Sequence, residues 1–108
     1  MIFQSLYESS IRGELILVDG GICHWHLRKD GQITIREIIV LPERQGSGIG
    51  SKILESLRRI SGAKSIVARC PSELPANYWY KKKRFRQIGK QMTKSGKTVY
   101  IWRLSLTQ

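Results

Sequence analysis

A glycine-rich turn between a strand-like and a helix-like segment constrains the fold of this chain more than any other feature. Residues 32–41 are rich in β-branched side chains, which predicts a long strand, and Pro42 ends it. Residues 49–60 place their apolar side chains along one helical stripe. Residues 45–50 read Gln-Gly-Ser-Gly-Ile-Gly and lead into that helix. The strand must therefore turn into the helix through a short segment with a permissive backbone.

The other segments alternate between strand-like and helix-like patterns. Gly20-Gly21 and Asp30-Gly31 are typical hairpin turns, so the first three strands are expected to form an antiparallel meander. The expected elements are a short helix over residues 1–12, strands over 14–19, 22–29 and 32–41, a helix over 49–60, a strand over 65–70, a helix from 75 to about 84, and strands over 85–92 and 98–106. Without repeats or linkers, one domain over residues 1–108 is expected.

Composition and isolated residues narrow the possible classes. No apolar run approaches the roughly 20 residues of a membrane span, and no secretory signal pattern is present, which favours a cytoplasmic location. Cys23 and Cys70 lie far apart without metal-type spacing, which predicts reduced, buried thiols. His24 and His26 have no third ligand nearby in the sequence, so a half-exposed strand face is favoured over a metal site.

The positive charge points to an anionic partner. Nineteen Lys and Arg against eight Asp and Glu give a formal net charge of +11, which attracts phosphates, nucleic acid or acidic protein surfaces. Residues 81–84, Lys-Lys-Lys-Arg, follow the aromatic residues 78–80, a combination also found in nucleic-acid binders. A solvated helix face is the commoner explanation, and a nucleic-acid-binding domain is kept as an alternative.

The glycine turn has the chemistry of an anion-binding site. Glycines bring backbone N–H groups close to a ligand, and the first-turn N–H groups of a helix are unpaired at its positive end. A Walker-type loop is excluded because Lys52 follows Ser51 rather than a glycine. A dinucleotide fingerprint fails because Ser51 or Ile53 stands where it requires Gly or Ala. A phosphate cradle is favoured over a turn whose glycines serve only close packing.

Two motifs carry a resemblance to a known family. Residues 40–50, Val-Leu-Pro-Glu-Arg-Gln-Gly-Ser-Gly-Ile-Gly, resemble the pyrophosphate-binding motif of the GNAT acetyltransferases, Gln/Arg-x-x-Gly-x-Gly/Ala between a strand and a helix. Residues 76–85 are similar to the family's second coenzyme-binding helix, which ends in a Tyr and then Gly-Phe. Tyr80 and Phe85 keep that spacing, whereas Arg84 replaces the glycine.

The resemblance covers about residues 14–106 and implies the α/β (α+β) GNAT fold. That fold is a mixed, mostly antiparallel sheet with flanking helices, which would splay near Val40 and Leu41. Most of a segment that supplies one strand and two helices in typical members is missing, so an N-terminally shortened member is expected. A small sheet with an exposed C-terminal strand also suggests a homodimer.

The resemblance implies an N-acetyltransferase that moves an acetyl group from acetyl-CoA to an amine of a small molecule or a protein, without a metal. The pantetheine arm would pair with the exposed strand edge, and a backbone N–H near Val40 or Leu41 would stabilise the oxyanion. A non-catalytic coenzyme-binding module is the other possibility within the family. The implied coenzyme-binding residues are Ile39, Val40, Leu41, Gln45, Gly46, Ser47, Gly48, Ile49, Gly50, Ser51, Asn77, Tyr80 and Lys83.

Two side chains are candidates for proton transfer. Tyr80 would protonate the departing thiolate, with an ordinary pKa of about 10 against about 8.5 for a thiol, unless it is a core aromatic. Glu37 lies where some relatives place the general base. Unbroken alternation puts Ile35, Glu37 and Ile39 on one face of the strand, from which Glu37 would point into the cleft. A salt bridge with an Arg on a neighbouring strand is the favoured alternative for Glu37.

Overall fold

The computed structural model describes residues 2–106. In chain order the elements are α1 (Ile2–Ile11), β1 (Leu15–Val18), β2 (Gly21–Leu27), β3 (Gln32–Val40), the 3-10 helix η1 (Pro42–Arg44), α2 (Ile49–Arg58), β4 (Ser65–Pro71), α3 (Ala76–Lys82), β5 (Arg86–Met92) and β6 (Thr98–Ser105). This confirms the expected order of helices and strands, and the ends differ by no more than two residues. None of these helices has the length and apolar content needed to cross a bilayer.

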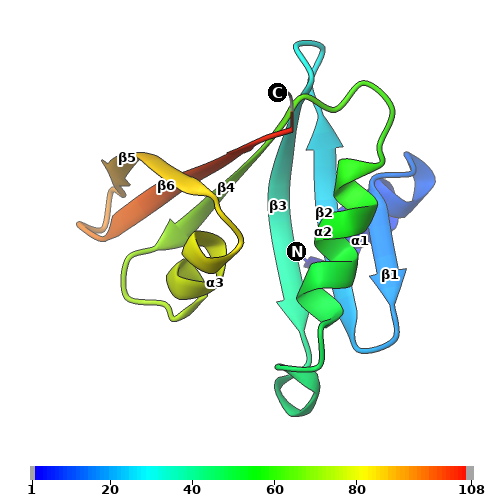
Figure 1. Cartoon of the computed structure of the whole chain (residues 1–108), viewed down its shortest axis with the longest axis horizontal. Helices are drawn as coiled ribbons and strands as arrows, with labels where there is room; N and C mark the ends of the chain where they lie inside the picture. The colour runs from blue at the N-terminus through cyan, green and yellow to red at the C-terminus, as the bar shows by residue number, and fades with distance from the viewer. Residues whose placement is uncertain (1, 107–108) are drawn as a thin grey trace.

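The strands form one sheet in the order β1-β2-β3-β4-β6-β5 (Figure 1). Only β3 and β4 are parallel among these neighbours, so the sheet is mixed and mostly antiparallel, as expected. The edges of the sheet are β1 and β5. The C-terminal strand β6 therefore lies between β4 and β5, and the expectation that it is an exposed edge is wrong.

The parallel strands β3 and β4 part midway along their length, as Figure 1 shows. Their pairing runs from Gln32 and Ser65 to Ile35 and Ala68 and then stops, although both strands continue. The splay expected near residues 40–41 thus begins several residues earlier. Beyond this point the inner edges of β3 and β4 have no strand partner.

A β-bulge just past the parting changes which side chains of β3 face the helices. The register of β2 and β3 shifts by one residue, which leaves Arg36 unmatched on β3. Ile35 faces the core before the bulge, and Ile38 and Val40 pack against the core after it. Glu37 therefore lies on the opposite face from Ile38. The expected unbroken alternation is wrong because the additional residue bends the strand and reverses its faces.

Helices cover the two faces of the sheet unequally. The helix α2 packs across β1, β2 and β3, and α3 contacts β4 and β5. We call the side that α2 and α3 cover the helical face, and the opposite side the outer face. The helix α1 contacts β1 and β2 and lies behind them in Figure 1, on the outer face. The outer face of β4, β6 and β5 is covered by none of the described helices.

The core lies between α2 and the sheet. The predicted apolar stripe of α2 is buried at Ile49, Ile53, Leu54 and Leu57. Cys23 and Cys70 are free and buried, as expected. Burial raises the pKa of the Cys23 thiol to about 12, so this thiol acts as a small apolar side chain.

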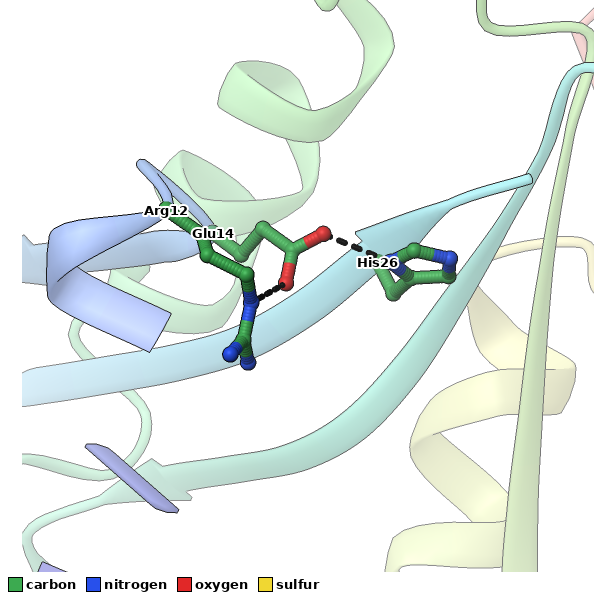
Figure 2. Close-up of polar contacts among 3 residues, drawn as sticks. All are labelled: Arg12, Glu14 and His26. Atoms are coloured by element: carbon green, nitrogen blue, oxygen red, sulfur yellow. Dashed lines mark hydrogen bonds and ion pairs between the residues drawn. The ribbon is translucent and has the colours of Figure 1, made fainter. Parts of the chain in front are cut away.

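A carboxylate joins the end of α1 to the outer face of β2 (Figure 2). Glu14 accepts a hydrogen bond from Arg12 Nε at 2.8 Å, and its other oxygen lies 2.5 Å from His26 Nδ1. Burial raises the pKa of Glu14, but the hydrogen bonds from Arg12 and His26 outweigh it and leave the pKa lowered. The carboxylate therefore stays charged at neutral pH and holds His26 through a hydrogen bond.

The second glycine of the β1–β2 turn is required by close packing. A Cβ on Gly21 would lie 2.7 Å from Ile49 Cγ2. We expect Gly21→Ala to lower the free energy of unfolding by about 1–3 kcal/mol, because the start of α2 must shift to make room. Gly89→Ala is the matched control, since its Cβ would make only an ordinary contact of 3.8 Å with Ile101. If urea denaturation showed the same loss of unfolding free energy in Gly21→Ala and Gly89→Ala, this account would be contradicted.

Candidate active site

A cleft of about 690 Å³ opens on the helical face where β3 and β4 part. Its size is typical of small-molecule sites. One wall is the inner edge of β3, the second is the glycine turn with the start of α2, and the third is α3. The lining residues are Ile38, Val40, Gln45, Gly46, Gly48, Ile49, Gly50, Ser51, Leu74, Pro75, Ala76, Trp79, Tyr80, Lys82 and Lys83.

The inner edge of β3 offers main-chain N–H groups to this cleft, and the carbonyl of Val40 accepts a 3.3 Å hydrogen bond from Gln45 Nε2. The N–H of Leu41 donates to the carbonyl of Gly20 at 2.9 Å. Because hydrogen-bonding directions alternate along a strand, Ile39 and Leu41 turn their main-chain groups toward β2, whereas Ile38 and Val40 turn theirs toward the cleft. An extended ligand lying beside β3 would therefore meet the N–H groups of Ile38 and Val40.

The glycine turn forms the second wall with backbone amides. Gly46 and Gly48 have φ values of +84° and +87°, and a Cβ at either position would meet nothing within 4 Å. The first hydrogen bond of α2 runs from the N–H of Lys52 to the carbonyl of Gly48, and no side chain caps the helix. The N–H groups of residues 49–51 thus have no helical acceptor. They lie at the positive end of the α2 dipole, which suits a phosphate group.

Aromatic side chains form the third wall. A Cβ on Gly50 would lie only 3.0 Å from the indole of Trp79. Because glycine has no Cβ, α2 packs directly on this ring. Tyr80 is 3% exposed, stacks on Trp102 and contacts the edge of Phe85. Burial raises the pKa of Tyr80, and Cys70 and Cys23 add to the effect. The phenol is therefore both part of the core and a protonated wall of the cleft.

The end of α3 explains the replacement of the family's glycine. The helix ends at Lys82, somewhat before the expected residue 84. Arg84 has a φ of +71° and is the one non-glycine residue with positive φ among residues 2–106. It adopts the left-handed conformation that glycine favours after a helix. Arg84 therefore permits the turn that a glycine would permit at this position, and the turn buries Phe85 beside Tyr80.

Most of the residues expected to bind the coenzyme lie together in the cleft. Their shared feature is a place on the glycine turn, the inner edge of β3 or the cleft side of α3. They are Val40, Gln45, Gly46, Gly48, Ile49, Gly50, Ser51, Tyr80 and Lys83. Ile39 and Leu41 do not line it, because the bulge turns their side chains to the outer face, where they are 40% and 46% exposed.

Two other expected residues make hydrogen bonds to other groups of the protein. The Ser47 hydroxyl donates to the carbonyl of Arg44. The Asn77 amide donates to the carbonyls of residues 71 and 74 and accepts a 2.8 Å hydrogen bond from Trp102 Nε1. Asn77 therefore holds α3 against β4 and β6 and does not line the cleft.

The sequence analysis missed six lining residues, Ile38, Leu74, Pro75, Ala76, Trp79 and Lys82. Five of them fall on or just before α3. Ala76, Trp79 and Lys83 stand three or four residues from one another or from Tyr80, which is the spacing of one helix face. That spacing was available in the sequence. The position of Ile38 was not, because it depends on the bulge.

Glu37 lies on the outer face at the parting rather than in the cleft. Its Oε1 is buried without a hydrogen-bond partner, and no ion pair of residues 2–106 involves it. The expected salt bridge is thus not formed. His24, its partner across β2 and β3, is buried rather than half-exposed. Burial, with Arg36 and Arg12, lowers the pKa of His24, so its imidazole is neutral. Within residues 2–106 no group of three potential ligands is placed to hold a metal ion.

Residues 6–94 match the family described as the acetyltransferase (GNAT) domain. This chain belongs to the GNAT acetyltransferase family. No curated protein matches it at a significant level. The GNAT fold is shared with solved structures that are less than 25% identical, and these similarities concern the fold.

Three solved structures show the extent of the shared GNAT fold. A Desulfovibrio desulfuricans protein assigned to the GNAT family has a TM-score of 0.72 at 21% identity, over 82% of this chain and 62% of that one. An aminoglycoside 6′-N-acetyltransferase complexed with coenzyme A has a TM-score of 0.76 at 14% identity, over 94% and 78%. A Salmonella typhimurium protein assigned as an acetyltransferase, solved with its cofactor acetyl-CoA, has a TM-score of 0.65 at 20% identity, over 82% and 59%. The chain thus spans less than two thirds of the length of the first and third of these.

Proposed function

We propose that this chain is an N-acetyltransferase that moves the acetyl group of acetyl-CoA to an amine. The observation that carries the proposal is the cleft, in which the unpaired amides of α2 and the free edge of β3 line one continuous surface. The first suits a diphosphate, and the second suits an extended arm with amide groups. A cytoplasmic location, a single domain over residues 1–108 and a homodimeric state remain predictions from the sequence.

Acetyl-CoA would lie along the cleft from the glycine turn toward the parting. Its diphosphate would accept hydrogen bonds from the N–H groups of residues 49–51, and its pantetheine arm would pair with the carbonyl of Ile38 and the N–H of Val40. Lys82 and Lys83 line the same cleft and would attract the remaining phosphate charge. These positions support Gln45, Gly46, residues 48–51, Tyr80 and Lys83 as contacts of the coenzyme.

The acceptor amine would approach the thioester from the outer face, through the parting. It would form the new C–N bond as the C–S bond breaks. The N–H of Leu41 is bonded to Gly20, so we assign the oxyanion to the N–H of Ile38, which is closer to the parting. Glu37 on the outer face would take the proton from the amine, and Tyr80 on the helical face would donate a hydrogen bond to the departing thiolate.

The direct test is calorimetric titration of the full chain with acetyl-CoA and coenzyme A, followed by a thiol-release assay over a panel of amines. We expect one-to-one binding of both coenzymes and thiol release that depends on the amine. The absence of binding would contradict the proposal. Binding without release over the panel would favour a non-catalytic coenzyme-binding module.

The same assays test the role of Tyr80. Its raised pKa keeps the phenol protonated, so it would stabilise the thiolate by a hydrogen bond. We expect Tyr80→Phe to lower kcat about tenfold and to change the Kd of acetyl-CoA less than twofold. Tyr100→Phe is the matched control, because Tyr100 packs on the core but does not line the cleft. An unchanged kcat would leave Tyr80 as a core aromatic alone.

A further inference from the structure

Four arginines share the outer face around the parting of β3 and β4. Arg103 on β6 pairs directly with Arg86 on β5 and, on its other side, with Val67 on β4. Val67 and Arg69 alternate with core residues of β4, and Arg103 lies between two core residues of β6. Cross-strand partners share a face, so these three arginines all point outward. Each is exposed.

Arg36 and Arg69 stand at the mouth of the parting. They are the first residues after the last paired residues of β3 and β4. Both are exposed, and Arg36 shares the outer face with Glu37 because of the bulge. We call Arg36, Arg69, Arg86 and Arg103 the arginine face.

The charge of the arginine face is not neutralised by the protein. None of the ion pairs of residues 2–106 includes any of its four members. Residues 74–108 contain nine Lys or Arg and no Asp or Glu, so no nearby carboxylate on β5 or β6 can relieve it. Like charges directly opposite each other, as at Arg86 and Arg103, destabilise a sheet. A bound anion would remove this repulsion.

The dimensions and chemistry of the arginine face favour a polypeptide anion. Neighbouring strands lie about 4.8 Å apart, so β4, β6 and β5 spread the charges over about 10 Å, more than a single phosphate covers. All four cations of the arginine face are guanidinium groups, whose planar fork pairs with carboxylates in a bidentate manner. The exposed aromatics among the described residues are Phe3, Tyr7 and Tyr78, on α1 and α3. None of them lies on β4, β5 or β6, so the strands that carry Arg69, Arg86 and Arg103 lack the stacking surface with which single-stranded nucleic acids are bound.

We propose that the acceptor is an amine of a carboxylate-rich protein segment, which the arginine face binds. This inference rests on the proposed acetyltransferase function, and it names the acceptor class. The acidic side chains pair with Arg69, Arg86 and Arg103, which holds the segment across β4, β6 and β5. Its amine then reaches the parting beside Glu37, on the side of the sheet opposite the coenzyme cleft.

The test measures binding and transfer separately with the full chain. Two peptides are compared, each with a C-terminal label and a free N-terminal amine. The acidic peptide continues with Asp and Glu, and the control peptide has Asn and Gln at the same positions. By fluorescence anisotropy without coenzyme, we expect the acidic peptide to bind at least about tenfold more tightly and to weaken as salt is added. With acetyl-CoA, mass spectrometry should show faster acetylation of the acidic peptide.

Substitutions locate the binding surface. Arg69→Gln with Arg103→Gln should raise both the Kd and the KM of the acidic peptide about tenfold and leave the Kd of acetyl-CoA unchanged. Lys94→Gln with Lys97→Gln removes the same charge from the β5–β6 turn and should change them less than twofold. Equal losses in the two double variants would overturn the proposal, because they would indicate net charge rather than this surface.

The remaining outcomes are also decisive. Equal binding of the two peptides, or tighter arginine-dependent binding of a single-stranded oligouridine, would overturn the acidic-protein assignment. An acidic peptide that binds through the arginine face but is not acetylated, in a protein that binds acetyl-CoA, would overturn its role as acceptor. Failure of the proposed function is recognised separately, as the absence of acetyl-CoA affinity in calorimetry.

Discussion

Gly48→Val is expected to weaken acetyl-CoA binding by at least about a hundredfold. Gly48 has a φ of +87° immediately before α2, a conformation that a β-branched residue adopts only with strain. The turn must therefore move, and the amides of residues 49–51 lose their alignment with the diphosphate. The new side chain would also occupy the open space above them. Charge-assisted hydrogen bonds contribute about 1.5–3 kcal/mol each, so the loss of two accounts for the effect.

A matched glycine separates loss of binding from loss of stability. Gly96 in the β5–β6 turn has a φ of +84° and equally open surroundings, so Gly96→Val introduces the same backbone strain far from the cleft. Both variants should lower the melting temperature similarly. Only Gly48→Val should lose the stabilisation that acetyl-CoA gives in a thermal-shift titration. Retained stabilisation by the coenzyme in Gly48→Val would refute the assignment of the cradle.

Glu37→Gln is expected to lower kcat about a hundredfold, the range typical for loss of a general base. The substitution keeps the size of the side chain and removes its ability to accept the proton of the amine. Glu37 lies on the outer face, away from the coenzyme cleft, so the Kd of acetyl-CoA should stay within twofold. Steady-state kinetics with saturating acetyl-CoA and the most reactive amine of the panel measures the effect.

The control for Glu37 makes the same chemical change on the surface. Glu55 lies on α2 and pairs with Arg59 at 3.4 Å, and Glu55→Gln should leave kcat unchanged because exposed helix pairs contribute little. If Glu37→Gln kept full kcat, Glu37 would have no part in proton transfer. Its unpaired buried oxygen would then be a feature of packing between β2 and β3.

The order of elements was predictable from the sequence because its signals are local. Gly-Gly and Asp-Gly pairs mark two hairpins, Pro42 ends a strand, and the apolar stripe of α2 has helical spacing. The glycine turn was predictable for the same reason, because its residues are contiguous. These features depend on neighbours in the chain, and the structure confirms the elements they predict.

The faces of β3 were not predictable because a bulge of one residue leaves no mark in the sequence. Arg36 resembles any exposed strand residue, yet its lack of a partner on β2 reverses every side chain that follows. The prediction for Glu37 therefore had the right strand and the wrong face. The same shift turns the side chains of Ile39 and Leu41 away from the cleft.

Long-range polar contacts were equally hidden. Asn77 was expected in the cleft from its place in the motif, but its amide meets Trp102, 25 residues further along the chain. Which side chain a buried amide meets depends on how β6 packs behind α3, and no local pattern encodes that. Trp79 is a different case, because its spacing from Ala76 and Lys83 already places it on the helix face that lines the cleft.

The parting of β3 and β4 has a consequence for the size of the acceptor that the protein could use. A sheet that opens between two parallel strands can be approached from both sides, and the cleft described here bounds only what enters from one of them. Its volume limits the donor and sets no limit on the acceptor. An amine of a whole folded protein can thus be the acceptor, provided that the chain end or side chain that carries the amine fits between β3 and β4.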